Sequence, residues 1–175
     1  MVITTIWRSS KNTGGKERMN NHQFTEEELN IAKITVKTED LANIALSALG
    51  RMTQPVCMVS GPITSGGFND LEKNLEVFGK TIIALQGEGK NIFSQLPFED
   101  AMVRIWKEWK EEGYCMPLLT KIYAPILESR FVKIMYFIPG WEKSFGASWE
   151  YKKCAKLGIA RVLLSQEFIN KLLAA

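Results

Sequence analysis

The sequence predicts an α/β protein whose parallel sheet is covered by helices on both faces. Short apolar runs that fit strands alternate with amphipathic segments that fit helices, and this alternation is typical of a parallel sheet. The expected strands are 56–59, 91–94, 131–138 and 159–164. Small-residue loops at 61–67 and 139–146 each follow one of these strands. Because ligands of such sheets bind beyond the carboxyl ends of the strands, these two loops are the expected binding site.

Capping residues and apolar spacing predict the helices between and after these strands. They begin after Asn69, after Asp100, at 118, at 148 and at Gln166. Asn69 can cap the first of them, whose apolar positions recur at helical spacing. Pro125 is expected to kink or split the helix over 118–129, because proline removes a helical hydrogen bond. The helix over 148–157 is expected to carry Glu150 in its first turn.

The chain divides into three parts before any function is considered. Residues 1–24 are polar and contain glycine, so we expect a loosely ordered arm. Residues 25–54 form a helical extension, in which Thr25 and Glu28 make a capping box at the first helix. We expect this extension to pack on the main domain or on a partner subunit. The α/β domain itself then covers 55–175.

Charge and hydropathy argue against several classes of partner. The formal net charge of +3 is small and no obvious basic run is present, so nucleic acid is not an expected partner. No stretch approaches the ~20 apolar residues of a membrane span, so a membrane is not expected either. The first residues lack the charge and apolar order of a signal peptide, and the expected location is cytoplasmic.

Cysteine and histidine usage argues against metal sites and cofactors. Cys57, Cys115 and Cys154 lie far apart with no CxxC pair, which favours a reducing compartment and argues against a disulfide framework or a zinc site. The only histidine, His22, lies in the polar arm, so a mechanism with a histidine base or histidine metal ligands is not expected. The expectation is a protein with neither metal nor cofactor.

The stretch PGWEKSFGASWE, at 139–150, is the strongest candidate for a site. It joins a predicted strand to a predicted helix through a loop of small residues. At such a junction the free backbone N–H groups and the positive end of the helix dipole favour an anion. Ser144 adds a hydroxyl group and Glu150 a carboxylate close to whatever the loop holds.

This stretch, together with SGPIT at 60–64 and the later GIARVLL, resembles the nucleoside 2-deoxyribosyltransferase-like superfamily. Within it, the chain is most similar to a branch of phages and bacteria that carries the string PGW-x-x-S-x-GA-x-x-E. The resemblance covers about 55–164. It implies a Rossmann-like, flavodoxin-type sheet. It also implies hydrolysis or transfer at the N-glycosidic bond of a nucleoside or nucleoside 5′-monophosphate.

The resemblance also implies roles for particular residues. Glu150 matches the nucleophile that attacks the anomeric carbon of the sugar, and Ser144 and Gly146 match positions that hold a 5′-phosphate. The loop after the first strand would line the sugar and base. For Trp141 two roles stay open, packing in the protein and contact with the base. The candidate binding residues are Gly61, Pro62, Ile63, Trp141, Ser144, Gly146 and Ala147.

The chain departs from the family at its second acid. The family usually carries an Asp in the helix before the third strand, but LLTKIYAPILESRFVKIMYF contains none. Glu128 is the only acid there, and it is either an acid of the site or a solvated helix residue. Glu99 and Asp100, after the second strand, are the other candidates for this acid.

Three hypotheses stay open. The first is an enzyme with Glu150 as nucleophile, which needs a second carboxylate within reach of the sugar or base. The second is a non-catalytic nucleotide-binding module that keeps only the phosphate grip. The third is a scaffold that acts through its N-terminal helices. The base, the sugar and the choice between hydrolase and transferase stay open, and a homo-oligomer is possible because family members often share sites between subunits.

Overall fold

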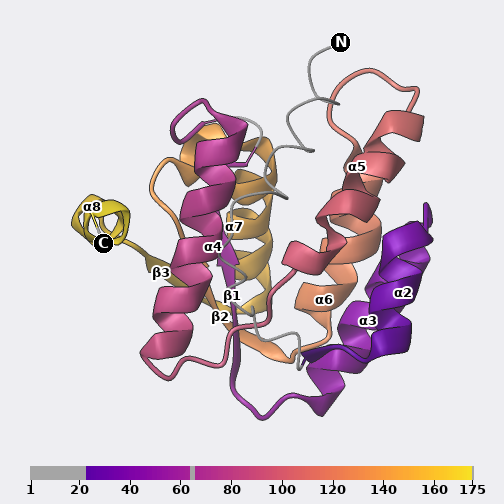
Figure 1. The fold of residues 1–175 in the computed structure, drawn as a ribbon, viewed down its shortest axis with the longest axis horizontal. Helices are drawn as coiled ribbons and strands as arrows, with labels where there is room; N and C mark the ends of the chain where they lie inside the picture. Colours follow the sequence, from indigo (N-terminus) through magenta and orange to yellow (C-terminus); the bar gives the residue numbers. More distant parts are fainter. Residues whose placement is uncertain (1–22, 64–65, 175) are drawn as a thin grey trace.

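A computed structural model describes residues 23–63 and 66–174 of the chain (Figure 1). The predicted arm, with His22, lies outside the described residues except for its last two positions. In chain order the elements are α2 (Glu26–Ile34), α3 (Thr38–Arg51), β1 (Val56–Ser60), α4 (Leu71–Gly87), η2 (Leu96–Phe98), α5 (Glu99–Glu108), η3 (Leu118–Tyr123), α6 (Ala124–Glu128), β2 (Val132–Phe137), η4 (Trp141–Lys143), α7 (Phe145–Leu157), β3 (Ala160–Leu163) and α8 (Gln166–Ala174).

The three strands form a parallel sheet in the order β1-β2-β3, which confirms the predicted α/β class. The predicted strand at 91–94 is reduced to a single parallel bridge between Ile92 and Cys57 on the other edge of β1. On the outer side of 91–94, a side chain takes the place that a further strand would have. Gln23 donates to the carbonyl oxygen of Ile92 at 2.6 Å and accepts from the N–H of Ser94 at 2.9 Å. An edge that is covered in this way offers no ladder to another strand.

Helices pack on both faces of the sheet, and a bulge in β2 sets which side chains face each layer. Val56 pairs with Val132 but Cys57 pairs with Ile134, so Lys133 is an extra residue in the ladder. Beyond the bulge the side chains alternate strictly between two apolar clusters. One cluster joins the sheet to α4 and α8, and the other joins it to α3, α6 and α7.

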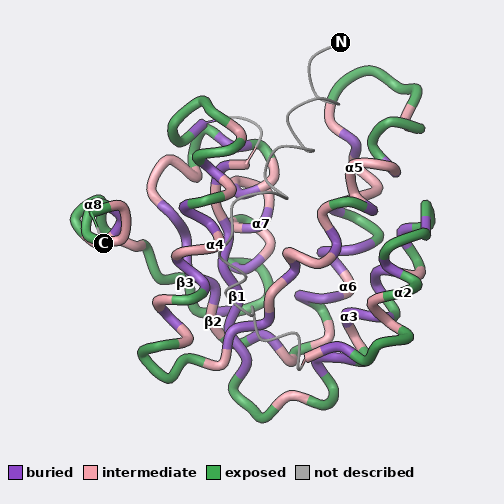
Figure 2. The backbone as a smooth tube through the Cα atoms, viewed as in Figure 1, coloured by how far each residue is buried: buried purple, intermediate pink, exposed green. Residues whose placement is uncertain are grey.

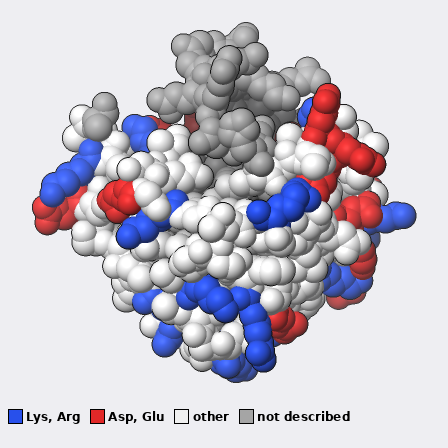
Figure 3. All heavy atoms as spheres, turned by 90° about the horizontal axis from the view of Figure 1, so that it is seen from below, with Lys and Arg blue, Asp and Glu red and all other residues white. Residues whose placement is uncertain are grey.

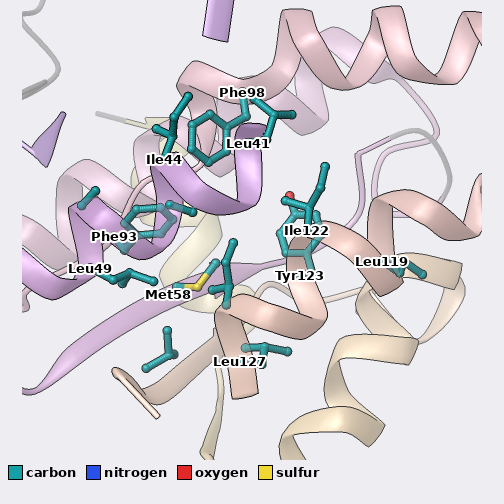
Figure 4. Close-up of a cluster of buried hydrophobic side chains, with 14 of the residues drawn as sticks. Leu41, Ile44, Leu49, Met58, Phe93, Phe98, Leu119, Ile122, Tyr123 and Leu127 are labelled. Carbon is teal, nitrogen blue, oxygen red and sulfur yellow. The ribbon is translucent and has the colours of Figure 1, made fainter. Parts of the chain in front are cut away.

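The N-terminal helices belong to the second of these clusters. Leu41, Ile44 and Leu49 of α3 lie in one apolar layer with Met58 of β1 and Leu127 of α6 (Figure 4). The predicted packing of the extension on the main domain is therefore observed.

The predicted capping box of α2 is present in full. Thr25 accepts from the N–H of Glu28 at 3.1 Å, and the Glu28 carboxylate accepts from the N–H of Thr25 at 2.9 Å. Two backbone donors at the helix start are satisfied reciprocally. The first helix therefore begins where the sequence pattern placed it.

Two helix starts differ from the sequence-based expectation. Asp70, not Asn69, caps α4, because its carboxylate accepts from the N–H of Lys73 at 2.9 Å. Helix α7 begins at Phe145, three residues earlier than expected, with Ser144 as its N-cap. Glu150 therefore lies in the second turn of α7 and not in the first.

The remaining helix expectations hold in outline. The expected helix over 118–129 splits into a π-helical turn, η3, and the short α6, with Pro125 at the start of α6 as predicted.

Strands β1 and β2 are largely buried, whereas every residue of β3 is exposed (Figure 2). Strands β1 and β2 therefore form the buried part of the sheet, and β3 is its exposed edge.

Candidate active site

A cavity of about 380 Å³ opens at the carboxyl end of β1, where the sequence predicted a site. Two of its walls carry most of its polar groups. The strand-end wall consists of residues at the end of β1 and the start of α7: Ser60, Gly61, Ile63, Ser144, Gly146, Ala147 and Glu150. The helix wall consists of residues of α5 and the segment after it: Glu99, Met102, Val103, Trp106 and Tyr114. Residues of α4 and η3 add a mostly apolar part of the lining, and Gln95, Gly113 and Cys115 complete it.

Glu150 is the buried acid of the strand-end wall, with 7% of its surface exposed. Its carboxylate accepts a hydrogen bond from the hydroxyl of Ser60, the last residue of β1. Burial raises the pKa of Glu150 to about 7, although the hydrogen bond from Ser60 favours the ionised form. A carboxyl group in this setting can change its protonation state near neutral pH.

The strand-end wall depends on close contact between the loops that follow β1 and β2. The N–H of Ile138 donates to the carbonyl oxygen of Ser60 at 2.9 Å. Gly61 lies so close to β2 that a Cβ there would be 2.8 Å from the Cβ of Ile138. Gly140, with φ of 88°, brings the second loop against Gly67 of the first. The small residues are therefore needed for the two loops to meet.

Glu99 is the acid of the helix wall, and it is partly buried. It is the first residue of α5, and its Oε1 atom is buried without a hydrogen-bond partner in the part of the chain that the structure describes. Burial raises the pKa of Glu99 to about 7, and the charge of Asp100 acts in the same direction. Gln95, which also lines the cavity, has a buried and unpartnered Oε1 atom as well. Buried polar atoms without partners are uncommon and mark places where a ligand can supply the missing bond.

Tyr114 extends from the helix wall to the strand-end wall. Its ring stacks on Phe145 with centroids 4.7 Å apart, and a Cβ at Gly146 would lie 2.9 Å from its hydroxyl oxygen. Burial raises the pKa of Tyr114 to about 12, with a contribution from the charge of Glu150. Its hydroxyl group therefore stays protonated at neutral pH.

Cys154 is the buried thiol beside this site. Burial, together with the charge of Glu150, raises the pKa of Cys154 to about 12. The thiolate is the reactive form of cysteine, so this residue is inert at neutral pH.

The structure brings six of the predicted site residues to the cavity. They are Gly61, Ile63, Ser144, Gly146, Ala147 and Glu150. Two further binding candidates are buried or packed outside it. Pro62 is buried against Gly67 and Gly140. Trp141 stacks on Tyr151 with centroids 4.1 Å apart and lies outside the lining, so its side chain packs and does not face a ligand there.

Neither of the two acids that were paired with Glu150 as catalytic candidates lines the cavity. Asp100 is exposed at the start of α5, one residue after Glu99. Glu128 ends α6 with half of its side chain exposed and pairs with Lys153. Of the acids considered from the sequence, Glu99 is the one that joins Glu150 in the cavity.

Apart from Glu99, the residues of the helix wall were not predicted to belong to the site, although a signal for them exists. Glu99, Met102, Val103 and Trp106 follow the spacing i, i+3, i+4 and i+7, so they share one face of α5. An acid in line with an apolar face indicates a buried carboxyl group. Trp106 lines the cavity with 45% of its surface exposed. Tyr114 lies in a loop with no periodicity, and no pattern pointed to it.

Neither a cluster of metal-ligating side chains nor a membrane-spanning helix occurs within 23–63 and 66–174. No three or more His, Cys, Asp and Glu side chains in that part of the chain gather closely enough to hold a metal ion. No helix there is long and apolar enough to cross a membrane. Figure 3 shows basic and acidic side chains lying beside one another at several places on one face.

Comparison of the whole chain with protein-family models, curated proteins and solved structures found no match. Function is therefore inferred from the two walls of the cavity and the groups that they hold.

Proposed function

We propose that the protein cleaves or transfers the N-glycosidic bond of a nucleoside or nucleoside 5′-monophosphate. One observation carries the proposal: two carboxyl groups from separate elements line the same largely apolar cavity, Glu150 being buried and Glu99 partly buried with its Oε1 atom enclosed. Glycoside cleavage generally uses such a pair, because one carboxylate stabilises or traps the cationic sugar while the other moves the proton.

The chemistry assigns one step to each acid. The ionised carboxylate of Glu150 attacks the anomeric carbon, forming a C–O bond as the bond from that carbon to the base nitrogen breaks. Glu99 gives its proton to the departing base. A water molecule, or a second base in a transferase, then attacks the anomeric carbon and releases Glu150. The proton of the attacking group goes back to Glu99.

The surroundings of the two acids support this division. The hydroxyl of Ser60 donates to Glu150, and a donated hydrogen bond favours the carboxylate. Glu99 has a buried oxygen without such a donor, and an apolar setting of that kind favours the neutral acid. With the pKa of each near 7, part of the molecules hold Glu150 ionised and Glu99 protonated at neutral pH, which is the required state.

The sheet topology is consistent with a Rossmann-like, flavodoxin-type arrangement, which is part of this proposal. The bridge at Ile92 lies beside β1, and β2 and β3 follow on its other side. The chain therefore leaves β1 first to one side and then to the other, and the cavity lies at this change of direction. Ligands of open α/β sheets bind at such a point.

A non-catalytic nucleotide-binding module is the second candidate. It is favoured by the start of α7, where Ser144, Gly146 and Ala147 line the cavity. A phosphate grip needs only backbone N–H groups at a helix N-terminus. Such a module would bind a monophosphate and release no base.

Release of free base tests the proposal. The purified protein is incubated with ribo- and deoxyribonucleosides and their 5′-monophosphates, with and without an acceptor base, and products are separated by chromatography. We expect free or exchanged base from the wild type and none from Glu150→Ala. The exposed acids Asp100 and Glu128 provide matched controls, and Asp100→Asn and Glu128→Gln should retain activity.

Base release that survives in Glu150→Ala, or no release from any substrate, contradicts the proposal. Thermal stabilisation by a monophosphate without base release supports the binding module.

A further inference from the structure

The start of α7 is the place where the resemblance expects a 5′-phosphate, and aromatic side chains already lie against it. The side chain of Ser144 caps the helix by accepting from the N–H of Ala147 at 3.4 Å. The next residue, Phe145, is stacked by the ring of Tyr114. The hydroxyl of Tyr114 lies over Gly146, close enough that a single added methyl group there would meet it at 2.9 Å. Tyr114 therefore takes up part of the space in front of the first turn of α7, beside the residues of that turn that line the cavity.

The charges around the cavity also disfavour a phosphate. Among the described residues that line it there is no lysine or arginine. The ionisable groups there include the two acids, Glu150 and Glu99, and both become negative as the pH rises above about 7. A dianion placed beside them would meet like charge with no cation to offset its desolvation.

The hydroxyl of Tyr114 suits a neutral partner. It stays protonated, and none of the hydrogen bonds between described residues uses it. A sugar hydroxyl can accept the one hydrogen bond that the Tyr114 hydroxyl donates, and this contact leaves no charge without a partner. A phosphate needs several donors or a cation in addition, and it needs the space that the tyrosine ring fills.

We propose that Tyr114 closes the N-terminus of α7 against phosphate and makes the cavity select an uncharged nucleoside, whose sugar accepts a hydrogen bond from the Tyr114 hydroxyl. This inference rests on the proposed function, because it names the substrate class of the same cavity. Tyr114 acts here as the specificity-determining residue.

The test compares kcat/KM for a nucleoside and for its 5′-monophosphate in three proteins. The wild type should prefer the nucleoside at least tenfold. Tyr114→Phe keeps the ring but removes the donor, and should lower kcat/KM for the nucleoside by about five- to tenfold, the effect of one net hydrogen bond. Tyr114→Ala removes the ring, and should reduce the preference for the nucleoside several-fold. Tyr151→Phe is the matched control, because Tyr151 stacks on Trp141 outside the cavity.

Two results overturn the inference while the proposed function stands: equal or better turnover of the monophosphate by the wild type, and an unchanged preference in Tyr114→Ala. If no substrate releases base, the proposed function fails and binding decides the inference separately. Thermal unfolding of Glu150→Gln is then followed with a nucleoside and with its monophosphate. Stabilisation by the nucleoside alone supports the inference, and stabilisation by the monophosphate, or by neither, overturns it.

Discussion

Glu150 on the strand-end wall accepts a hydrogen bond from Ser60, whereas Glu99 on the helix wall keeps a buried oxygen without a partner among the described residues. Burial raises the pKa of both side chains to about 7, so the two acids differ in their partners and not in their pKa. In the proposed mechanism, the hydrogen bond from Ser60 favours the carboxylate of Glu150, and the lack of such a donor favours the neutral acid at Glu99.

The two walls are also held in place by different means. Backbone hydrogen bonds fix the strand-end wall, since Ser60 ends a buried strand and accepts from Ile138 at its carbonyl oxygen. The helix wall depends on the packing of α5, a short helix whose buried residues are Ala101 and Ile105. We therefore expect changes on the strand-end wall to affect both rate and stability, and changes on the helix wall to affect mainly rate and specificity.

The largest expected effect is on the rate of base release. Glu150→Gln removes the proposed nucleophile and should lower kcat by about 10³-fold or more, whereas Glu99→Gln removes the proposed proton donor and should lower it by about 10²-fold. The pH profile separates the two roles. The wild-type rate should be highest near pH 7, and the fall on the alkaline side should be absent in Glu99→Gln because no acid is left to deprotonate. An alkaline fall that persists in Glu99→Gln would show that another group supplies the proton, with Asp100→Asn as the neighbouring control.

The next effect is on the pH dependence of folding. The pKa of Glu150 is about 7 in the folded protein against an ordinary value of 4.5, so the folded state binds its proton more tightly than the unfolded state. Its contribution to the free energy of unfolding is therefore full below about pH 4.5 and is lost as the pH rises to about 7. Glu150→Gln should be more stable than the wild type by about 2–3 kcal/mol at pH 8, with little difference at pH 4.5. Urea denaturation at both pH values measures this, and equal stability at pH 8 would contradict it.

The strand-end wall could largely be predicted from sequence, and the reason is physical. A buried strand, a loop of small residues and a helix start are local features, and Gly61, Ser144 and Glu150 lie within them. The hydrogen bond between Ser60 and Glu150 joins residues 90 positions apart and needs the parallel pairing of β1 with β2. No local sequence pattern predicts that pairing. Tyr114 could not be predicted, because its place in the cavity depends on a loop whose path is set by packing alone.

A smaller effect separates the glycines of the strand-end wall. Gly61→Ala would place a Cβ 2.8 Å from that of Ile138 and should lower the free energy of unfolding by about 1–3 kcal/mol, since backbone must shift. Gly146→Ala would place a Cβ 2.9 Å from the Tyr114 hydroxyl oxygen, a contact with a side chain and not with backbone, and should lower the free energy of unfolding less than Gly61→Ala does. Gly79→Ala, in α4 with open space around it, is the control and should stabilise by about 0.5–1 kcal/mol. Chemical unfolding measures all three, and a cost at Gly146 as large as at Gly61 would mean that Tyr114 is rigidly held.

The smallest effect distinguishes a helix cap from a ligand contact at Ser144. Ser144→Ala should lower the free energy of unfolding by about 0.5–1 kcal/mol through loss of the cap on α7. Thr25→Ala removes the cap of α2, far from α7 in the chain, and is the matched control. It should lower the free energy of unfolding by a similar or larger amount, because the capping hydrogen bond is shorter at Thr25, 3.1 Å, than at Ser144, 3.4 Å. If Tyr114 excludes phosphate, Ser144→Ala should change KM for a nucleoside less than threefold, as Thr25→Ala should. A tenfold rise of KM for a monophosphate in Ser144→Ala alone would instead place the phosphate at the start of α7, and the strand-end wall would then hold substrate as well as nucleophile.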